Sequence, residues 1–339
     1  MPKFYFLLLA LFCFSESVQA QEEVNVAQIL DSLQYGAELP SEILQTKSLV
    51  LVKVPPKSTQ PYLRGSWKKL AEQAQPGFKR AGIDAVVYYY VEDIYSGKEP
   101  YLSFMEDFKK RGLENIIFLV QEAANYRIVL TKMNDGDPLI KSGQQAWQTQ
   151  HADLAMALNN LYKAAANSAQ ARENLLILEV PEFGTMTSPI KGRRGEYYDL
   201  NFSSERLAIV PFADTAQINQ VMADYPYKYG FVDANKGDTK LRSDGYQYIL
   251  YYVHTTGKEV KEMLGYNTTD TETAYVSEVV KDGQVRVNSY SIDIPVYKFY
   301  IKHIYSGNVF LGKKWDAAPT WQQALTNYID NLRNELVRK

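Results

Sequence analysis

Hydrophobic positions along the chain fall into two patterns, and each pattern predicts one kind of element. Short unbroken apolar runs that end at proline or at polar residues are typical of strands buried on both faces. Apolar residues that recur at every third or fourth position predict helices with one buried face. In the first half the order is strand, helix, strand, helix, strand, strand, helix. The predicted strands cover 49–54, 84–91, 115–120 and 126–133, and the predicted helices cover 66–82, 101–112 and 144–166.

Similar stretches return in the second half in the same order. "SLVLVKVP" from Ser48 aligns with "NLLILEVP" from Asn174, and both predict a buried strand. "YRIVLTKMNDG" from Tyr126 aligns without a gap with "YKFYIKHIYSG" from Tyr297. Matches that keep their order along the chain indicate an internal duplication.

We therefore predict two tandem duplicated α/β domains, each an open mixed sheet flanked by helices. A lead-in at 21–47 precedes the first copy at 48–166, and a linker at 167–173 leads to the second copy at 174–339, which insertions enlarge. The element order resembles the thioredoxin-like core, and a flavodoxin-like sheet is equally compatible with it. Because the chain has no Cys-x-x-Cys motif, the redox chemistry of the thioredoxin family is excluded.

The N-terminus predicts a signal peptide at 1–20. A lysine precedes the apolar run at 4–14, and a small residue, Ala20, stands where a signal peptidase would cut. The run is shorter than the roughly 20 residues that span a bilayer. Cys13 follows Phe12 inside the run, which argues against a lipoprotein. We expect an exported, soluble protein, periplasmic or secreted.

Composition narrows the class of protein. Cys13 is the only cysteine, and a mature chain without disulfides favours a bacterial envelope protein over a eukaryotic secreted one. The formal net charge of -2 argues against a general nucleic-acid binder, which needs a concentrated positive field. No later segment is apolar enough to predict a transmembrane helix. The 26 tyrosines predict sheets with aromatic faces.

A short motif, Ser or Thr followed by Gly-Lys-Glu, occurs once in each half. It can be interpreted as an anion site at a helix N-terminus, with lysine adding charge and glycine allowing close approach. It can also be interpreted as a capping box, in which the hydroxyl and the glutamate bond to backbone N–H groups, and this is the favoured interpretation. The candidate ligand-binding residues are Ser96, Gly97 and Lys98 in the first half and Thr256, Gly257 and Lys258 in the second.

Basic loops with glycine follow the first predicted strand of each copy, where an open α/β sheet docks ligands. We include Arg64 and Gly65 of the first loop among the candidate ligand-binding residues, although a solvated surface loop is the favoured alternative. The other basic residues of the two loops are Lys57, Lys191, Arg193 and Arg194.

His254 is the candidate catalytic residue, because it lies at the end of a predicted strand just before Thr256. Asp214 or Asp233 could complete an acid–base pair with it. The other two histidines have no nearby ligand pattern, so we predict no metal site and no cofactor. No Gly-x-Ser-x-Gly elbow supports a serine hydrolase.

These observations predict an exported, non-catalytic binding or assembly protein of the bacterial cell envelope, with an unknown protein or a small anionic ligand as partner. The alternative is an exported hydrolase or transferase that acts on an anionic substrate near Lys258 and His254. A third possibility is a purely structural duplicated module, which predicts no concave site at the strand ends.

Overall fold

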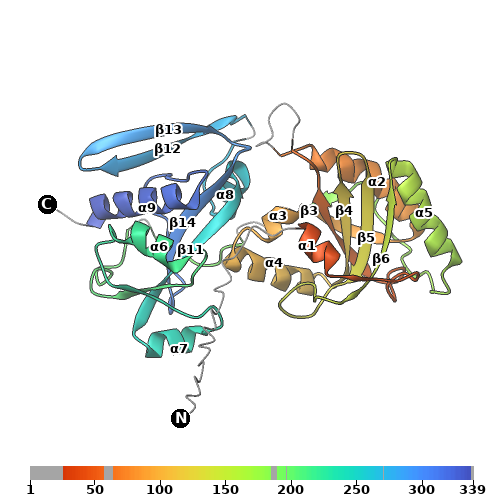
Figure 1. The fold of residues 1–339 in the computed structure, drawn as a ribbon, viewed down its shortest axis with the longest axis horizontal. Coiled ribbons are helices and arrows are strands. Elements are labelled where there is room, and N and C mark those ends of the chain that lie inside the picture. Colours follow the sequence, from red (N-terminus) through yellow and green to blue (C-terminus); the bar gives the residue numbers. More distant parts are fainter. Residues whose placement is uncertain (1–25, 57–63, 185–188, 196, 270, 337–339) are drawn as a thin grey trace, which may run out of the picture.

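A computed structural model describes residues 26–56, 64–184, 189–195, 197–269 and 271–336. It contains two large mixed sheets flanked by helices, which lie side by side along the long axis of the molecule (Figure 1). The predicted signal peptide at 1–20 lies outside the described residues. Within the described ranges, no helix is long and apolar enough to cross a bilayer.

The first sheet has the strand order β1-β6-β5-β4-β2-β3-β7. β3, β2 and β4 run parallel at its centre, whereas β5 is antiparallel to β4 and β6 is antiparallel to β5. The residues of β2 between its two ends are buried, as expected for a central strand. The strands are β1 (Gln34–Tyr35), β2 (Lys47–Lys53), β3 (Asp84–Tyr90), β4 (Leu113–Gln121), β5 (Tyr126–Lys132), β6 (Gln145–His151) and β7 (Glu182–Phe183).

Helices cover both faces of this sheet. α2 and α5 pack against one face and against each other, and α1, α3 and α4 cover the other face (Figure 1). α2 ends at Gly82, whose φ of 82° is the left-handed conformation that closes many helices. The helices are α1 (Val26–Asp31), α2 (Trp67–Ala81), α3 (Val91–Ile94), α4 (Lys98–Lys110) and α5 (Leu154–Asn167).

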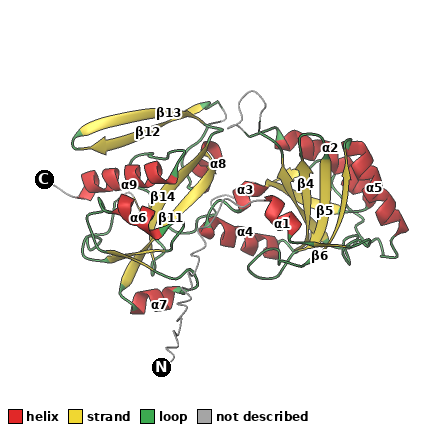
Figure 2. Cartoon of the chain, in the orientation of Figure 1, coloured by secondary structure: helices red, strands yellow, loops and turns green. Residues whose placement is uncertain are grey.

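The second sheet has the order β10-β9-β11-β14-β15-β8. α6 and α9 pack on one face of it, and a separate hairpin of β12 and β13 lies over α9 (Figure 2). The strands are β8 (Arg194–Gly195), β9 (Arg206–Ile209), β10 (Tyr229–Phe231), β11 (Tyr246–Thr256), β12 (Ala274–Lys281), β13 (Gln284–Ser291), β14 (Pro295–His303) and β15 (Val309–Phe310). The helices are α6 (Thr215–Met222), α7 (Asp238–Ser243), α8 (Gly257–Met263) and α9 (Trp321–Leu336).

The two sheets share a strand order. β3-β2-β4-β5-β6 in the first corresponds to β10-β9-β11-β14-β15 in the second, and the first three strands of each set are parallel while the fourth is antiparallel. A pair of helices, α2 with α5 or α6 with α9, packs on one face of each set. The aligned stretches from Tyr126 and Tyr297 fall on the corresponding strands β5 and β14.

The strand predicted at 174–181 is not formed. Residues 171–178 have no regular structure, and the side chains of Leu175 and Leu176 are 86% and 93% exposed. An apolar run becomes a strand only where a neighbouring strand can accept its backbone hydrogen bonds. In the second sheet the place that β2 occupies in the first is taken by β9, which comes later in the chain.

One of the predicted helices is also wrong in its extent. The segment 144–166 is not one helix, because Gln145–His151 forms β6 beside β5. The helix begins only at Leu154, where the Asp153 carboxylate caps it by accepting a hydrogen bond from Met156 N–H. The helix predicted at 66–82 is formed as α2, which continues through Pro76 to Ala81.

Tyrosine side chains form aromatic clusters on the sheets, as the composition predicts. Tyr251 of β11 stacks on Tyr300 of β14 with ring centres 5.7 Å apart. On the other face of β11, Tyr252 packs against Phe212 and Phe299. The aromatic rings therefore contribute much of the core of the second half.

Candidate functional site

The two halves meet where α3 and the start of α4 lie against β11 (Figure 1), a contact that we call the seam. Val91 and Ile94 of α3 belong to the same buried cluster as Val253 of β11. The backbone takes part as well, because His254 N–H donates to the carbonyl oxygen of Ser96 at 2.6 Å. A continuous core and a backbone hydrogen bond therefore join the two sheets.

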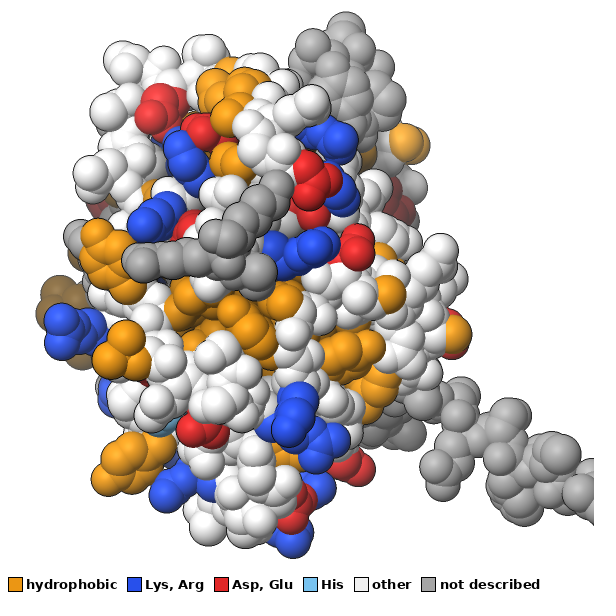
Figure 3. Space-filling view, turned by 90° about the vertical axis from the view of Figure 1, so that its left-hand side faces the viewer, with side chains coloured by type: hydrophobic (Ala, Val, Ile, Leu, Met, Phe, Trp, Pro, Cys, Tyr) orange, Lys and Arg blue, Asp and Glu red, His pale blue; other side chains and the backbone are white. Residues whose placement is uncertain are grey.

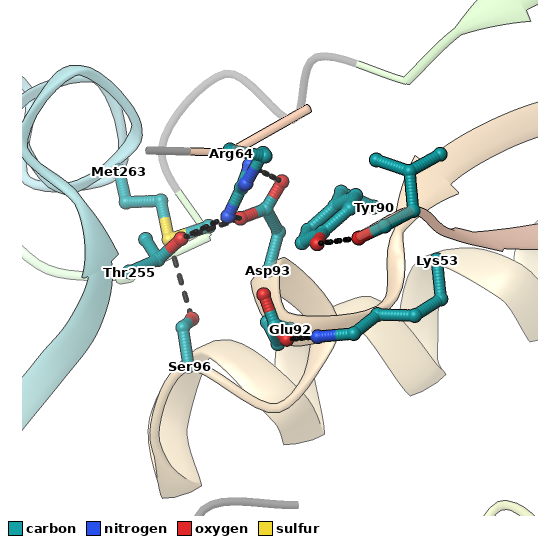
Figure 4. Close-up of polar contacts among 9 residues, drawn as sticks. Lys53, Arg64, Tyr90, Glu92, Asp93, Ser96, Thr255 and Met263 are labelled. Atoms are coloured by element: carbon teal, nitrogen blue, oxygen red, sulfur yellow. Dashed lines mark hydrogen bonds and ion pairs between the residues drawn. The ribbon is translucent and has the colours of Figure 1, made fainter. Parts of the chain in front are cut away.

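Asp93 of α3 is the centre of a buried polar cross-link over the seam (Figure 4). Nη1 and Nη2 of Arg64 donate to its two carboxylate oxygens at 3.1 and 2.8 Å. Nη2 also donates to the Thr255 hydroxyl at 2.8 Å, and that hydroxyl donates to Asp93 at 2.5 Å. The side chains of Arg64 and Asp93 are only 11% and 7% exposed. Because a buried carboxylate is costly unless it is paired, these three residues satisfy one another's charge and hydrogen bonds.

Aromatic stacking adds to the cross-link. The Arg64 guanidinium lies 3.9 Å from the centre of the Tyr90 ring. The Tyr90 hydroxyl donates to the carbonyl oxygen of Val54 at 3.4 Å, at the end of β2. Next to Asp93, Glu92 forms an ion pair with Lys53 (Figure 4). The seam is thus fixed to the carboxyl ends of β2 and β3, where open α/β sheets bind ligands.

A hollow of about 220 Å³ lies beside the cross-link, and residues of both halves line it. We call it the seam hollow. Its aromatic lining comes from the first half and consists of Trp67, Tyr89, Tyr90 and Phe183. Its charged lining comes from both halves and consists of Lys68, Asp93, Lys258, Glu259 and Glu262. Aromatic rings and charged groups therefore both line this hollow.

Glu259 differs from Asp93 because Arg64 and Lys68 offset its charge only in part. Burial, and then the nearby carboxylates of Asp93 and Glu262, raise the pKa of Glu259 to about 7. Within the described part of the chain its carboxylate has no hydrogen-bond or ion-pair partner. Glu259 can therefore accept a hydrogen bond from a ligand, or exchange a proton near neutral pH.

One cation of the seam hollow, Lys68, lies against its aromatic rings. Lys68 Nζ lies 5.6 Å from the ring centre of Trp67 and 5.4 Å from that of Phe183. Positive and negative side chains are therefore mixed in the lining. Among the described residues, no group of three or more His, Cys, Asp or Glu side chains could hold a metal ion.

The two copies of the Gly-Lys-Glu motif lie at one seam instead of at two separate sites. The Ser96 hydroxyl donates to Sδ of Met263 at 3.4 Å. A Cβ on Gly97 would overlap the carbonyl oxygen of Tyr252, so glycine allows the backbones to approach. Gly257 is packed in the same way against the Tyr275 ring. Ser96 and Gly97 therefore help to hold the two halves together, whereas the contact of Gly257 lies within the second half.

The predicted capping boxes are not formed. The side chains of Ser96 and Thr256 make no capping hydrogen bond to α4 or α8. Glu99 instead bonds to the Tyr300 hydroxyl at 2.6 Å and pairs with Lys302, both on β14. For Glu99, tertiary partners have replaced the local one, since a charged partner outweighs a backbone N–H. Lys98 Nζ donates to the carbonyl oxygen of Ala234 at 2.6 Å.

His254 is directed away from the seam hollow. It is next to Thr255 on β11, so its side chain lies on the opposite face of the sheet. The ring stacks on Tyr297 at 3.8 Å, and burial lowers the pKa of His254 to about 4. Asp214 caps α6, and Asp233 accepts a hydrogen bond from Asn235 N–H. Within the described residues, neither carboxylate bonds to His254, so the predicted acid–base pair is not assembled.

The basic loops have structural contacts of their own. A Cβ on Gly65 would be 2.5 Å from the carbonyl oxygen of Pro55, which explains the glycine. Lys191 pairs with Glu106, and the Arg194 guanidinium donates to the carbonyl oxygen of Leu264 at 2.9 Å. Lys57 lies outside the described residues.

Asp93, Glu259 and Phe183 are the site residues that the sequence analysis missed. Asp93 and Glu259 each follow the carboxyl end of a parallel strand, a signal that could have found them. Phe183 comes after the predicted linker, and no local pattern marks it. No protein-family model matches the chain, and no curated protein matches it either.

Proposed function

We propose that the protein is a non-catalytic binding or assembly protein of the bacterial cell envelope, and that its ligand or partner docks in the seam hollow. The observation that carries the proposal is the carboxylate of Glu259, which has no hydrogen-bond or ion-pair partner among the described residues and lies in a hollow that both halves line. A ligand there would contact aromatic rings of the first half and charged groups of α8 together. Ordinary surface loops rarely combine these features.

The lining favours a partner that donates hydrogen bonds. Asp93, Glu259 and Glu262 bring three carboxyl groups to the hollow, beside the two cations Lys68 and Lys258, so the lining does not favour a strongly anionic ligand. Trp67 and Phe183 offer apolar surface next to Glu259. We therefore infer a protein segment or a neutral to cationic ligand, instead of the small anion that the lysines and arginines suggest.

The test is capture from the native envelope with a matched pair of variants. Lys68 lines the hollow, whereas its exposed neighbour Lys69 does not. We expect the wild type and Lys69→Glu to retain the same amount of the co-purifying molecule, and Lys68→Glu to change that amount by at least roughly 10-fold, because it reverses a charge in the lining. Equal retention by both variants would place binding elsewhere.

We also propose that the protein is exported and that its two α/β domains arose by duplication. The pattern at 1–20 supports a signal peptide, and the shared strand order of the two sheets supports an ancestral copying event. In this proposal β9, not the stretch from Asn174, corresponds to β2. The domain limits at 48–166 and 174–339, and a thioredoxin-like or flavodoxin-like relationship, stay predictions.

A second candidate function is an exported hydrolase or transferase that uses the second half. One observation favours it: Glu259, with its pKa raised to about 7, lies near the charge-paired carboxylate of Asp93. Two carboxyl groups in contrasting environments are a common arrangement for acid–base catalysis. The discriminating observation is turnover that depends on the carboxyl group of Glu259 and not on His254.

A further inference from the structure

The hairpin of β12 and β13 has one backbone edge that pairs with nothing else in the described chain. Its turn, Asp282-Gly283, has φ values of 49° and 77°, which are typical of a two-residue type I′ turn. Lys281 and Gln284 are therefore the first hydrogen-bonded pair, and every second residue of β13 bonds to β12.

The backbone groups of Val285, Val287 and Ser289 consequently point away from β12. Other hydrogen bonds of the hairpin agree with this alternation of inward-pointing and outward-pointing backbone groups. Ile292 N–H donates inward to the carbonyl oxygen of Thr273 at 3.0 Å. On the other strand, Glu278 lies opposite Val287, and its N–H points out of the hairpin and donates to the carbonyl oxygen of Trp315 at 2.7 Å. The outer edge of β12 is thus covered, and that of β13 is open.

β13 lacks the devices that normally protect an edge strand. It contains no proline and no lysine, its register with β12 has no bulge, and Arg286 is its one charged residue. Residues 284–289 are all exposed. In Figure 1 the strand forms the upper border of the molecule, farther from α9 than β12.

The outer face of the hairpin carries exposed valines as well, beside Glu278 and Ser289. Val276, Val285 and Val287 are 54%, 58% and 60% exposed, although valine in a sheet usually packs against a neighbour. The turn belongs to the end of the molecule seen in Figure 3, where hydrophobic side chains are exposed among charged ones. An open edge combined with an exposed valine face is a template for another strand.

We propose that β13 pairs antiparallel with β13 of a second copy of this chain, with the two-fold axis at Val287. In this register Val287 is opposite Val287 of the second copy, and Val285 is opposite Ser289. All three outward-pointing residues then exchange backbone hydrogen bonds, and the valine faces of the two hairpins join on one side of a four-stranded sheet.

Charge selects this register and favours a second copy as the occupant. With the axis at Val287, Arg286 is opposite Asn288 of the second copy, so no like charges meet. With the axis at Arg286, two guanidinium groups would be directly opposite, which destabilises a strand pair. With the axis at Asn288, each valine of β13 would be opposite a serine. The strand is therefore complementary to itself in one register.

The first test is the mass of the purified full chain in solution, measured by light scattering over a range of concentrations. The wild type should be a dimer that dissociates on dilution. Val287→Pro removes an N–H that points away from β12, so the hairpin is kept while the dimer is lost. Circular dichroism checks that this variant is folded. A monomeric wild type, or a folded Val287→Pro variant that stays dimeric, would overturn the proposal.

The second test fixes the register by disulfide formation in a Cys13→Ala background, which has no other cysteine. In Val287→Cys the two cysteines would be opposite, with Cα atoms roughly 5.5 Å apart, within disulfide range. In Gln284→Cys the two cysteines would be roughly 20 Å apart along the strands. Mild oxidation should cross-link most of the first variant and little of the second. Equal cross-linking of both would contradict the register.

Discussion

Asp93 and Glu259 occupy comparable places in the two halves, yet their surroundings differ. Each is the third residue of a short helix that follows a parallel strand, α3 after β3 and α8 after β11. Asp93 is fully compensated by Arg64 and Thr255. Glu259 has no such partner, and burial and neighbouring carboxylates raise its pKa to about 7.

The difference shows that the role of a carboxylate at a strand end depends on what a third segment brings to it. Arg64 comes from the loop after β2 and turns Asp93 into a structural cross-link. Nothing comparable reaches Glu259, so its hydrogen-bonding capacity is left for a ligand. Removing the partner of Asp93, or the charge of Glu259, tests this distinction.

The largest effect is expected from Arg64→Ala. It would leave the Asp93 carboxylate buried without its bidentate partner, and we expect a loss of about 3–5 kcal/mol in the free energy of unfolding. Arg64→Lys keeps the charge but not the paired geometry, so its loss should be smaller. Urea denaturation at pH 7 measures both values.

Arg80→Ala is the matched control for Arg64→Ala. The Arg80 guanidinium also stacks on a tyrosine, 4.2 Å from the ring centre of Tyr162, but its side chain is exposed. We expect a loss of about 0.5–1 kcal/mol. If the two alanine variants lose similar amounts, the cross-link at Asp93 contributes no more than surface stacking.

Glu259→Gln should have the next largest effect, and its sign depends on pH. The folded protein keeps the Glu259 proton up to about pH 7, whereas the unfolded chain releases it near about pH 4.3. Stability is therefore lost as the pH rises through this window. Glutamine cannot ionise, so the variant should be more stable than the wild type at pH 8, on the order of 1–2 kcal/mol, and not at pH 4. Thermal unfolding at the two pH values measures the difference.

Glu72→Gln, at an exposed position on α2, is the control for removing a surface charge. A Glu259→Gln variant that is less stable than the wild type at pH 8 would show that the folded protein compensates the charge of this carboxylate.

The Glu259→Gln variant also distinguishes the binding protein from the hydrolase or transferase. A hydrolase that needs the Glu259 proton would lose at least roughly 100-fold of its turnover, whereas binding would tolerate an amide of the same shape.

The fold was predictable where the pattern and the tertiary partners agree. β2, β3, β4 and β5 lie close to their predicted ranges because buried strands require unbroken apolar runs. The stretch from Asn174 has the same pattern as β2, but no neighbouring strand is available to it, and it stays irregular. An apolar run shows that a segment could form a buried strand, but the strand forms only where a neighbouring strand pairs with it.

The site was predictable only in part. Sequence analysis of the strand ends indicated Arg64 and Lys258, and the structure places Lys258 in the lining of the seam hollow and Arg64 on Asp93 beside it. It could not show that the loops of two halves meet, because contacts between Ser96 and Met263 join residues far apart in the chain. It also favoured His254, whose position on β11 directs its ring to the other face.

The smallest effect is expected from Ser96→Ala, which tests whether this candidate binds a ligand or only belongs to the seam. The change removes a weak hydrogen bond to Met263 but keeps the backbone bond from His254 N–H, so the loss should be about 0.5 kcal/mol. Ser103→Ala is the matched control, because the Ser103 hydroxyl is buried without a partner in the described chain, and its removal should be neutral or slightly stabilising. Capture of the envelope partner should be unchanged in both variants. If Ser96→Ala alone loses that partner while its stability is kept, the hydroxyl contacts the ligand, and the contrast between a structural Asp93 side and a binding Glu259 side of the seam is wrong.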